Sequence, residues 1–182
     1  LAILAFENHS GDARYDAMGV GLQDMLVTDL GHVEALQLVE RAKLSAVLSE
    51  LDLASTPYAD PTAAVEVGKV VSAQWVVTGG LMAVEPTLRL DARVVDVQTG
   101  AILATSEASG PTDEFFLLEK ELANELLVAL DVTVSARASA RIGRVQTESF
   151  AAFVSYADGL AALDAGEVRR AAEALAKALQ AD

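Results

Sequence analysis

The sequence predicts an α/β fold, in which helices pack on a mixed sheet, followed by a helical hairpin. Three observations in the 182-residue chain predict it. Apolar runs alternate with helical periodicity over residues 1–72, β-branched and alternating segments fill residues 74–109, and residues 148–182 have helical periodicity alone. The expected order is β-α-β-α-α-β-β-β-α, as a two-layer or three-layer sandwich, and then the hairpin.

Two short apolar runs near the start predict strands. Residues 1–6 end in the turn-forming residues 7–12, so they are expected to form a buried strand. Leu36, Leu38 and Val39 suggest a second strand. Because a helix is expected between these two runs, the opening strands should pair in parallel.

Three helices are expected in the same region. Apolar residues recur at helical spacing over residues 15–33 and again over residues 41–51. Asp60 and Pro61 are typical of a helix start, with Asp as the N-cap and Pro in the first helical position. This third helix should run to about Ser72.

Residues 74–109 predict an antiparallel meander. Strands are expected over residues 74–84, 88–97 and 101–109, because the connections between them are short enough for tight turns. Gly79 and Gly80 interrupt the first of these strands and predict a bulge or a close approach of another segment.

A long amphipathic helix should begin at Asp113 and complete an α/β domain over residues 1–134. The net charge of -14 belongs entirely to this part, which holds 7 basic and 21 acidic residues, whereas the rest of the chain holds six of each. A partner that is steered electrostatically should therefore meet the first domain, and salt should weaken that contact.

Residues 135–147 contain Arg137, Arg141 and Arg144 but no acidic residue. They are expected to form a basic linker or an extension of the preceding helix. The alternative is a strip that docks against the acidic domain.

Residues 148–182 predict two helices joined by a turn, in a pattern that resembles a tetratricopeptide repeat. Small residues at fixed offsets would let the two helices approach closely, and one Leu would fill the space between them. The sequence departs from the repeat at Ser155 and Ala162, so a generic helical hairpin stays open as an alternative. If the repeat is real, further repeats should follow it, since one cannot bury its own face. The matching residues are Gly159, Gly166, Ala171, Leu175 and Ala178.

Composition narrows the class of protein. Apolar residues make up 52% and charged residues 22%, so the chain can bury a core. The acidic balance argues against a free-standing binder of nucleic acid or anionic membranes, and no apolar run is long enough for a membrane-spanning helix. The absence of Cys excludes thiolate chemistry, and His9 and His32 leave little for a metal site, so no cofactor is expected.

No catalytic constellation is expected either. Ser10, His9 and Asp12 could be written as a triad, but triad members normally converge from separate segments, so these residues should instead cap their loop. Gly19 and Gly21 lack the spacing of a phosphate-binding loop and should permit close helix packing. His32 should cap a helix end, and Trp75 should lie in the core.

The acidic residues of the predicted helices are expected to form solvated faces. A weak divalent-ion site or a surface for a basic partner is the alternative. These residues are Asp24, Asp29, Asp113, Glu114, Glu119, Glu121 and Glu125.

Three stretches, "LAILAFENHSGDARYDAMGVGLQDMLVTDL", "LQLVERAKLSAVLSELDL" and "VVTGGLMAVEPTLRLDARVVDVQTGAIL", occur in an order that resembles a known family. They are similar to the curli secretion channel (CsgG-like) family and to the amino-terminal domain of TolB-type periplasmic proteins. The resemblance covers roughly residues 1–130 and implies a non-catalytic α/β domain of bacterial cell-envelope assembly or secretion. It also implies a precursor with a signal sequence, often a lipoprotein.

One departure from that family concerns pore formation. Its channel-forming members insert membrane-spanning β-hairpins, whereas the turns at Pro86 and Gly100 are minimal here. Arg89, Asp91 and Arg93 alternate along the middle strand, where lipid would not tolerate charge. We therefore expect no pore.

The leading hypothesis is a non-enzymatic protein-binding or assembly module of the cell envelope, in the periplasm or associated with the outer membrane. Its partners would be proteins, reached through the helical repeat and the acidic domain, and self-association stays open. The alternative is a sensor or oligomerisation domain of a cytoplasmic regulator or cyclase. A third hypothesis is an enzyme that acts on a small ligand through a cleft at the sheet edge.

Overall fold

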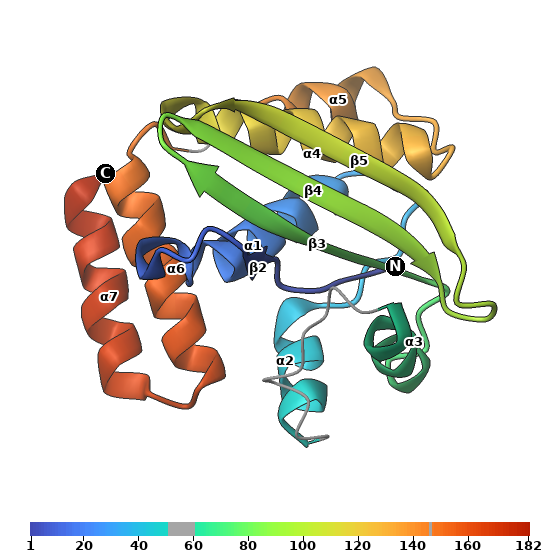
Figure 1. Ribbon diagram of the computed structural model, residues 1–182, viewed down its shortest axis with the longest axis horizontal. Helices are drawn as coiled ribbons and strands as arrows, with labels where there is room; N and C mark the ends of the chain where they lie inside the picture. Colours follow the sequence, from blue (N-terminus) through green and yellow to red (C-terminus); the bar gives the residue numbers. More distant parts are fainter. Residues whose placement is uncertain (51–60, 146) are drawn as a thin grey trace.

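A computed structural model describes residues 1–50, 61–145 and 147–182 of the chain, and its centre is a mixed sheet (Figure 1). The strand order is β1-β3-β4-β5, with β2 also paired to β3. β1 and β2 run parallel to β3, whereas β3, β4 and β5 form the predicted antiparallel meander. The strands are β1 (Ala2–Ile3), β2 (Glu7–Asn8), β3 (Trp75–Val84), β4 (Thr87–Asp96) and β5 (Ile102–Pro111).

The pairing of β3 with β4 sorts their side chains onto two faces, because neighbouring residues of a strand point to opposite sides. Val77 and Leu81 lie opposite Val94 and Leu90 in the register, and all four are buried. This inner face is therefore the one that packs against helices.

The outer face of the sheet is polar along most of β4. Arg89 forms an ion pair with Glu107 of β5, with 2.8 Å between Nη2 and Oε2. Asp91 lies opposite Glu107 in the register, and Arg93 follows on the same face. In Figure 1 this face points toward the viewer and α1 and α4 lie behind it. An antiparallel sheet with one solvent-exposed face accounts for the alternation of charged and apolar residues along β4.

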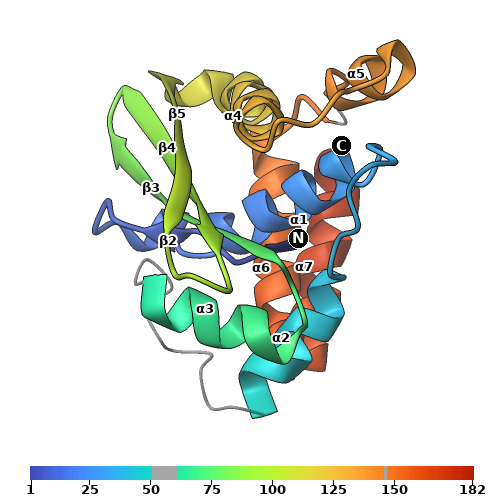
Figure 2. The ribbon, with the colours of Figure 1, turned by 90° about the vertical axis from the view of Figure 1, so that its right-hand side faces the viewer.

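Helices α1 (Met18–Leu30) and α4 (Phe115–Ala129) cover the inner face, and Figure 2 shows both on the same side of the sheet. Both helices were predicted from their apolar periodicity. Their buried side chains join those of the strands in the larger core cluster, which supplies most of the apolar burial that stabilises the fold. Fully buried members from the two helices are Leu22, Leu26, Leu30, Phe115, Leu122, Ala123 and Leu126.

A second core cluster lies at one end of the sheet. Helices α2 (Arg41–Glu50) and α3 (Pro61–Val70) contribute to it. Ala64 and Val67 of α3 pack with Val76 and Val97 of the sheet, next to Leu44 of α2. The fold thus has three layers at this end and two elsewhere.

The second predicted strand is wrong, because residues 36–39 form no strand. The Val39 N–H donates to the Leu1 carbonyl at 2.9 Å, and the amino group of Leu1 donates to the Gln37 carbonyl at 2.8 Å. Leu36 and Leu38 instead pack against the larger core cluster, which explains the apolar pattern. Residue 51 of the second predicted helix and the predicted N-cap Asp60 lie outside the described residues.

The first predicted strand is divided in two. The Leu4 N–H still donates to Val77 of β3 at 2.9 Å, but the Phe6 N–H turns away and donates to the Gly19 carbonyl of α1 at 3.2 Å. β2 then resumes the parallel pairing at Gly80 and Leu81. The interruption follows from the contact with α1.

Two glycines make close approaches possible near this interruption. A Cβ at Gly19 would lie 1.7 Å from the Phe6 carbonyl oxygen, and a Cβ at Gly79 would lie 2.1 Å from the Asp91 carbonyl oxygen and 2.6 Å from the Phe6 ring. The sequence predicted close packing at Gly19 and left a bulge or a close approach open at Gly79. The structure shows a close approach at Gly79 and places the irregular pairing at Val94 and Val95 instead.

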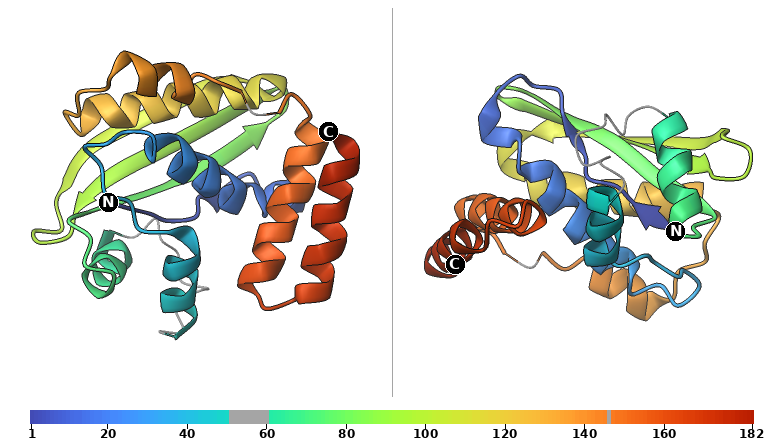
Figure 3. Two further views of the ribbon diagram at one scale, coloured as in Figure 1. Left: turned by 180° about the vertical axis from the view of Figure 1, so that it is seen from behind. Right: turned by 90° about the horizontal axis from the view of Figure 1, so that it is seen from below.

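The C-terminal part consists of three helices. α5 (Ala136–Ile142) buries Ile142 in the larger core cluster, and α6 (Phe150–Asp164) and α7 (Val168–Ala181) form an antiparallel pair, hereafter the helical pair. Figure 3 shows the helical pair standing beside the end of the sheet. Gly166 supplies a φ of +73° in its connecting turn. The predicted hairpin is confirmed, and two 3₁₀ turns, η1 (Ala13–Tyr15) and η2 (Thr112–Glu114), complete the described elements.

β5 is one edge of the sheet formed by the described strands. The Glu107 N–H of this edge donates to Oε2 of Glu125 on α4 at 3.0 Å, and the strand ends at Pro111, which has no N–H. Within the described residues, no helix has the length and apolar character needed to cross a membrane.

We predict that Gly19→Ala lowers the free energy of unfolding by about 3 kcal/mol or more, because a Cβ cannot occupy the space beside the Phe6 carbonyl. The gain in helix propensity, about 1 kcal/mol, is too small to offset this clash. Urea unfolding monitored by circular dichroism measures the change. Gly143→Ala is the matched control, since the nearest atom to its Cβ lies 3.5 Å away and its φ is -70°. Equal stability of the two variants would contradict the role given to Gly19.

Candidate functional site

A groove of about 620 Å³ lies between the α/β part and the helical pair. Residues of α1, α4, α6 and α7 line it. Its lining is mainly apolar, and its polar side chains are Asp24, Thr28, Thr147, Tyr156 and Asp182. We call it the interhelical groove, and its larger apolar lining residues are Met25, Phe116, Phe153, Leu175 and Leu179.

Aromatic packing fixes one wall of the interhelical groove. Phe153 of α6 lies 4.7 Å from Phe115 and 5.7 Å from Phe116 of α4, measured between ring centroids. The second contact is edge-on, with 85° between the ring planes, a geometry that the ring quadrupoles favour. Phe150 adds a further edge contact to Phe115 at 5.9 Å. The helical pair is thus packed onto the same core as the sheet.

Gly21 brings α6 close to α1. A Cβ at this position would lie 2.8 Å from both Phe153 and Ala157, so only Gly permits the contact at this distance. The sequence predicted close helix packing at Gly21, and the structure identifies its partner as the helical pair.

A polar network that includes the groove residues Asp24 and Tyr156 joins α1, α2 and α6. The Arg41 guanidinium donates to both carboxylate oxygens of Asp164 at 2.8 and 2.7 Å, and its Nε lies 3.3 Å from Asp24. The Tyr156 hydroxyl donates to the other oxygen of Asp24 at 2.8 Å. Burial, followed by this bond to Asp24, raises the pKa of Tyr156 to about 12, so the hydroxyl keeps its proton at neutral pH. Four side chains from α1, α2 and α6 are therefore held in one geometry.

Helix α7 forms the outer wall of the groove. Leu175 fills the space over Gly159, where a Cβ would lie 2.7 Å from the Leu175 side chain. This is the packing that the small-residue offsets predicted. One turn further on, Leu179 lines the groove and is 82% exposed. An exposed apolar side chain at the rim of an apolar groove is typical of a contact surface.

A buried ionic cluster lies between α1 and α4. Lys120 Nζ lies 2.5 Å from Asp29 and 2.9 Å from Glu119, and all three side chains are almost fully buried. The predicted solvated face is therefore wrong for Asp29 and Glu119, because the helix face that carries them packs inward. Asp24 also differs from the predicted solvated face, because it contacts Arg41 and Tyr156.

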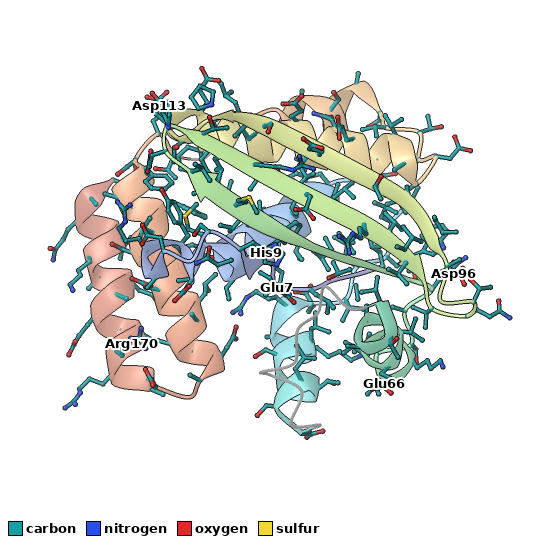
Figure 4. All side chains as sticks on the ribbon, in the orientation of Figure 1. Glu7, His9, Glu66, Asp96, Asp113 and Arg170 are labelled. Atoms are coloured by element: carbon teal, nitrogen blue, oxygen red, sulfur yellow. The ribbon has the colours of Figure 1, made fainter. Side chains whose placement is uncertain are left out.

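The loop after β2 does not assemble a triad. His9 Nε2 lies 3.2 Å from Glu7 Oε2, the Ser10 hydroxyl donates to Asn8 Oδ1, and Asp12 accepts from the Arg14 N–H at 3.0 Å. Figure 4 shows Glu7 and His9 beside the sheet, away from Asp113 and Asp96 at its two ends. The residues serve as turn and cap groups, as predicted.

The remaining predicted residues stay apart from the groove. His32 follows the end of α1, and Trp75 is a half-buried residue packed against the larger core cluster. Arg137, Arg141 and Arg144 are exposed on and after α5. In the part of the chain that the structure describes, no three His, Asp or Glu side chains gather in a way that could hold a metal ion.

Sequence reasoning missed most of the groove. Met25 and Phe116 had been assigned to helix faces without a partner, and Arg41 had received no role. The only usable signal was the Gly159 and Leu175 offset, which predicted how α6 meets α7. Nothing in the sequence predicted that the pair would pack against α1 and α4.

Comparison with known proteins confirms the resemblance to the CsgG-like family. Residues 1–89 match the sequence model of the family described as curli production assembly/transport component CsgG. A protein of Rhizobium meliloti (strain 1021) that is named as adenylate cyclase 3 is 23% identical over 154 residues. The alignment covers 82% of this chain but 24% of that protein, so the chain spans about a quarter of this relative's length.

Two solved structures share the fold. The C-terminal domain of LpoB from Salmonella enterica has 18% identity and a TM-score of 0.51, covering 61% of this chain and 81% of its own. Lipoprotein GNA1162 from Neisseria meningitidis also has 18% identity and a TM-score of 0.51, covering 69% of this chain and 94% of its own. At this identity the two matches show a common fold.

We predict that Arg41→Met lowers the free energy of unfolding by about 1–3 kcal/mol, since it leaves Asp24 and Asp164 without their shared cation. Urea unfolding measures the change. Arg170→Met is the matched control, because Arg170 pairs with Glu167 on the exposed surface, where ion pairs contribute about 0–1 kcal/mol. A similar small effect in both variants would show that the network does not hold the helical pair.

Proposed function

We propose that the chain is a non-enzymatic protein-binding module of bacterial cell-envelope assembly, and that the interhelical groove is its binding surface. The match of residues 1–89 to a family described as a curli assembly and transport component supports the envelope setting. The fold shared with a protein named as a lipoprotein supports it further. A periplasmic or outer-membrane-associated location is part of this proposal.

The exposed Leu179 beside the groove is the main observation in support of protein binding. Burying such a side chain fully is worth about 1.5–3 kcal/mol, and Leu179 remains 82% exposed. Groove walls made of Met25, Phe116 and Leu175 would surround an apolar side chain of a partner. Central apolar contacts of this kind dominate protein interfaces.

The domain division belongs to the same proposal. Residues 1–134 would form the acidic envelope domain, residues 135–147 a basic connection, and residues 148–182 the first of several tetratricopeptide-like repeats. The acidic domain would then steer a basic partner toward the groove, and further repeats would extend the helical surface.

The second candidate is a regulatory domain of a longer signalling protein. The relative named as adenylate cyclase 3 aligns with 82% of this chain, but the alignment covers 24% of that protein, which favours an accessory role for the shared segment. The gene sequence upstream of Leu1 separates the two candidates. A signal peptide supports the envelope module, and a cyclase or DNA-binding domain supports the regulator.

We predict that Leu179→Asp reduces capture of a protein partner about tenfold or more, because a carboxylate would have to be buried in an apolar contact. The measurement is affinity capture from an envelope extract with the full chain as bait, followed by quantitative mass spectrometry. The candidate partner is then purified and its dissociation constant is measured directly.

The control for this experiment is Val168→Asp. Val168 is 71% exposed at the other end of α7 and does not line the groove. The same charge on the same helix should leave capture unchanged. Equal loss in both variants, or no loss in either, would refute the groove as the binding surface.

A further inference from the structure

The buried ionic cluster holds more negative than positive groups. Asp29 and Glu119 are 1% and 0% exposed, and Lys120 is 6% exposed. The single ammonium group of Lys120 is therefore shared by the carboxyl groups of Asp29 and Glu119. Neutrality within this cluster requires one additional proton, and an isolated buried charge is costly.

Glu119 is the carboxyl group that lacks support. Asp29 receives the short bond from Lys120, whereas neither oxygen of Glu119 accepts a well-directed hydrogen bond from the described residues. Its Oε2 does lie 2.9 Å from Lys120 Nζ, so the contact is one of charge proximity. A carboxylate without directed donors is poorly stabilised inside a protein.

The charged groups that act on Glu119 are Asp29 and Lys120. Asp29 comes from α1 and Lys120 from α4 itself. The inner face of β4 and β5, against which α4 packs, buries only uncharged side chains, namely Leu88, Leu90, Ala92, Val94, Ser106 and Ala108.

These surroundings favour the neutral carboxyl. Burial and then the negative charge of Asp29 raise the pKa of Glu119 to about 8, although Lys120 opposes them. Burial works against the charge of Lys120, but its interactions with Glu119 and Asp29 raise its pKa, so it stays cationic. The cluster at neutral pH is thus a neutral set of three side chains.

We propose that the buried ionic cluster is a proton-operated latch, in which a proton on Glu119 holds α4 against α1 and release of this proton loosens that contact. In an opened state with α4 in solvent, Glu119 returns to its ordinary pKa of 4.5. Between this value and about 8 the open state loses the proton while the closed state keeps it, so rising pH favours opening. Below and above this range both states carry the same charge and the balance is constant.

The latch lies next to the interhelical groove. Asp29 directly follows Thr28, which lines the groove on α1, and Phe116 lines it on α4. Loosening the α1–α4 contact therefore changes two walls of the groove. An effect on partner binding rests on the proposed function, but the latch itself is a property of the chain alone.

Hydrogen–deuterium exchange of the full chain between about pH 5 and about pH 9 tests the latch, with each rate divided by its intrinsic rate. The opening constant of α1 and α4 peptides should rise by up to about tenfold per pH unit and level off near pH 8. Glu119→Gln, which is neutral at every pH, should remove this rise. Glu121→Gln is the matched control, because Glu121 is exposed on the same helix, and it should keep the rise.

A second measurement needs no variant. The carboxyl carbon resonance of Glu119 in the folded wild-type chain, assigned by NMR, should titrate near pH 8. A midpoint near the ordinary value of 4.5, a flat exchange profile in the wild type, or an unchanged rise in Glu119→Gln would each overturn the latch. None of these readouts uses a partner, so failure of the proposed function would leave them unaffected.

Discussion

The close approach of α1 to its neighbours is the constraint on which the rest of the structure depends. Gly19 lets the helix touch the backbone at Phe6, and Gly21 lets it touch α6. Asp29 on the same helix meets Lys120 of α4. One helix of 13 residues thus joins the parallel strands, the helical pair and the second large helix of the core.

This central position explains why charged groups occur at helix contacts in an otherwise apolar core. The Arg41 network lies at the rim, where Asp24 and Asp164 keep some solvent and the ions stay paired. The Asp29 and Glu119 pair lies deeper, where water is excluded and one proton must replace a missing cation. The same residue types therefore have different protonation behaviour because their depth differs.

The sequence predicted the elements better than their contacts. The meander, α1, α4 and the helical pair follow from periodicities of two and 3.6, which local residues determine. The strand predicted at residues 36–39 was wrong because an apolar run indicates burial and not hydrogen bonding. The groove and the buried ionic cluster were not predicted, for another reason. They join α1 to residues about ninety to one hundred and fifty positions away, and no local pattern encodes such a pairing.

The edge strand β5 affects how copies of this chain can associate. An exposed edge strand is a template on which a second chain can add its own strand, and this is a route to aggregation. Glu125 already occupies the N–H of Glu107, and Pro111 offers none, so the second half of β5 lacks two of the backbone donors that a neighbouring strand would need. The fold can therefore present apolar side chains on α7 for specific contact while its backbone edge resists indiscriminate pairing.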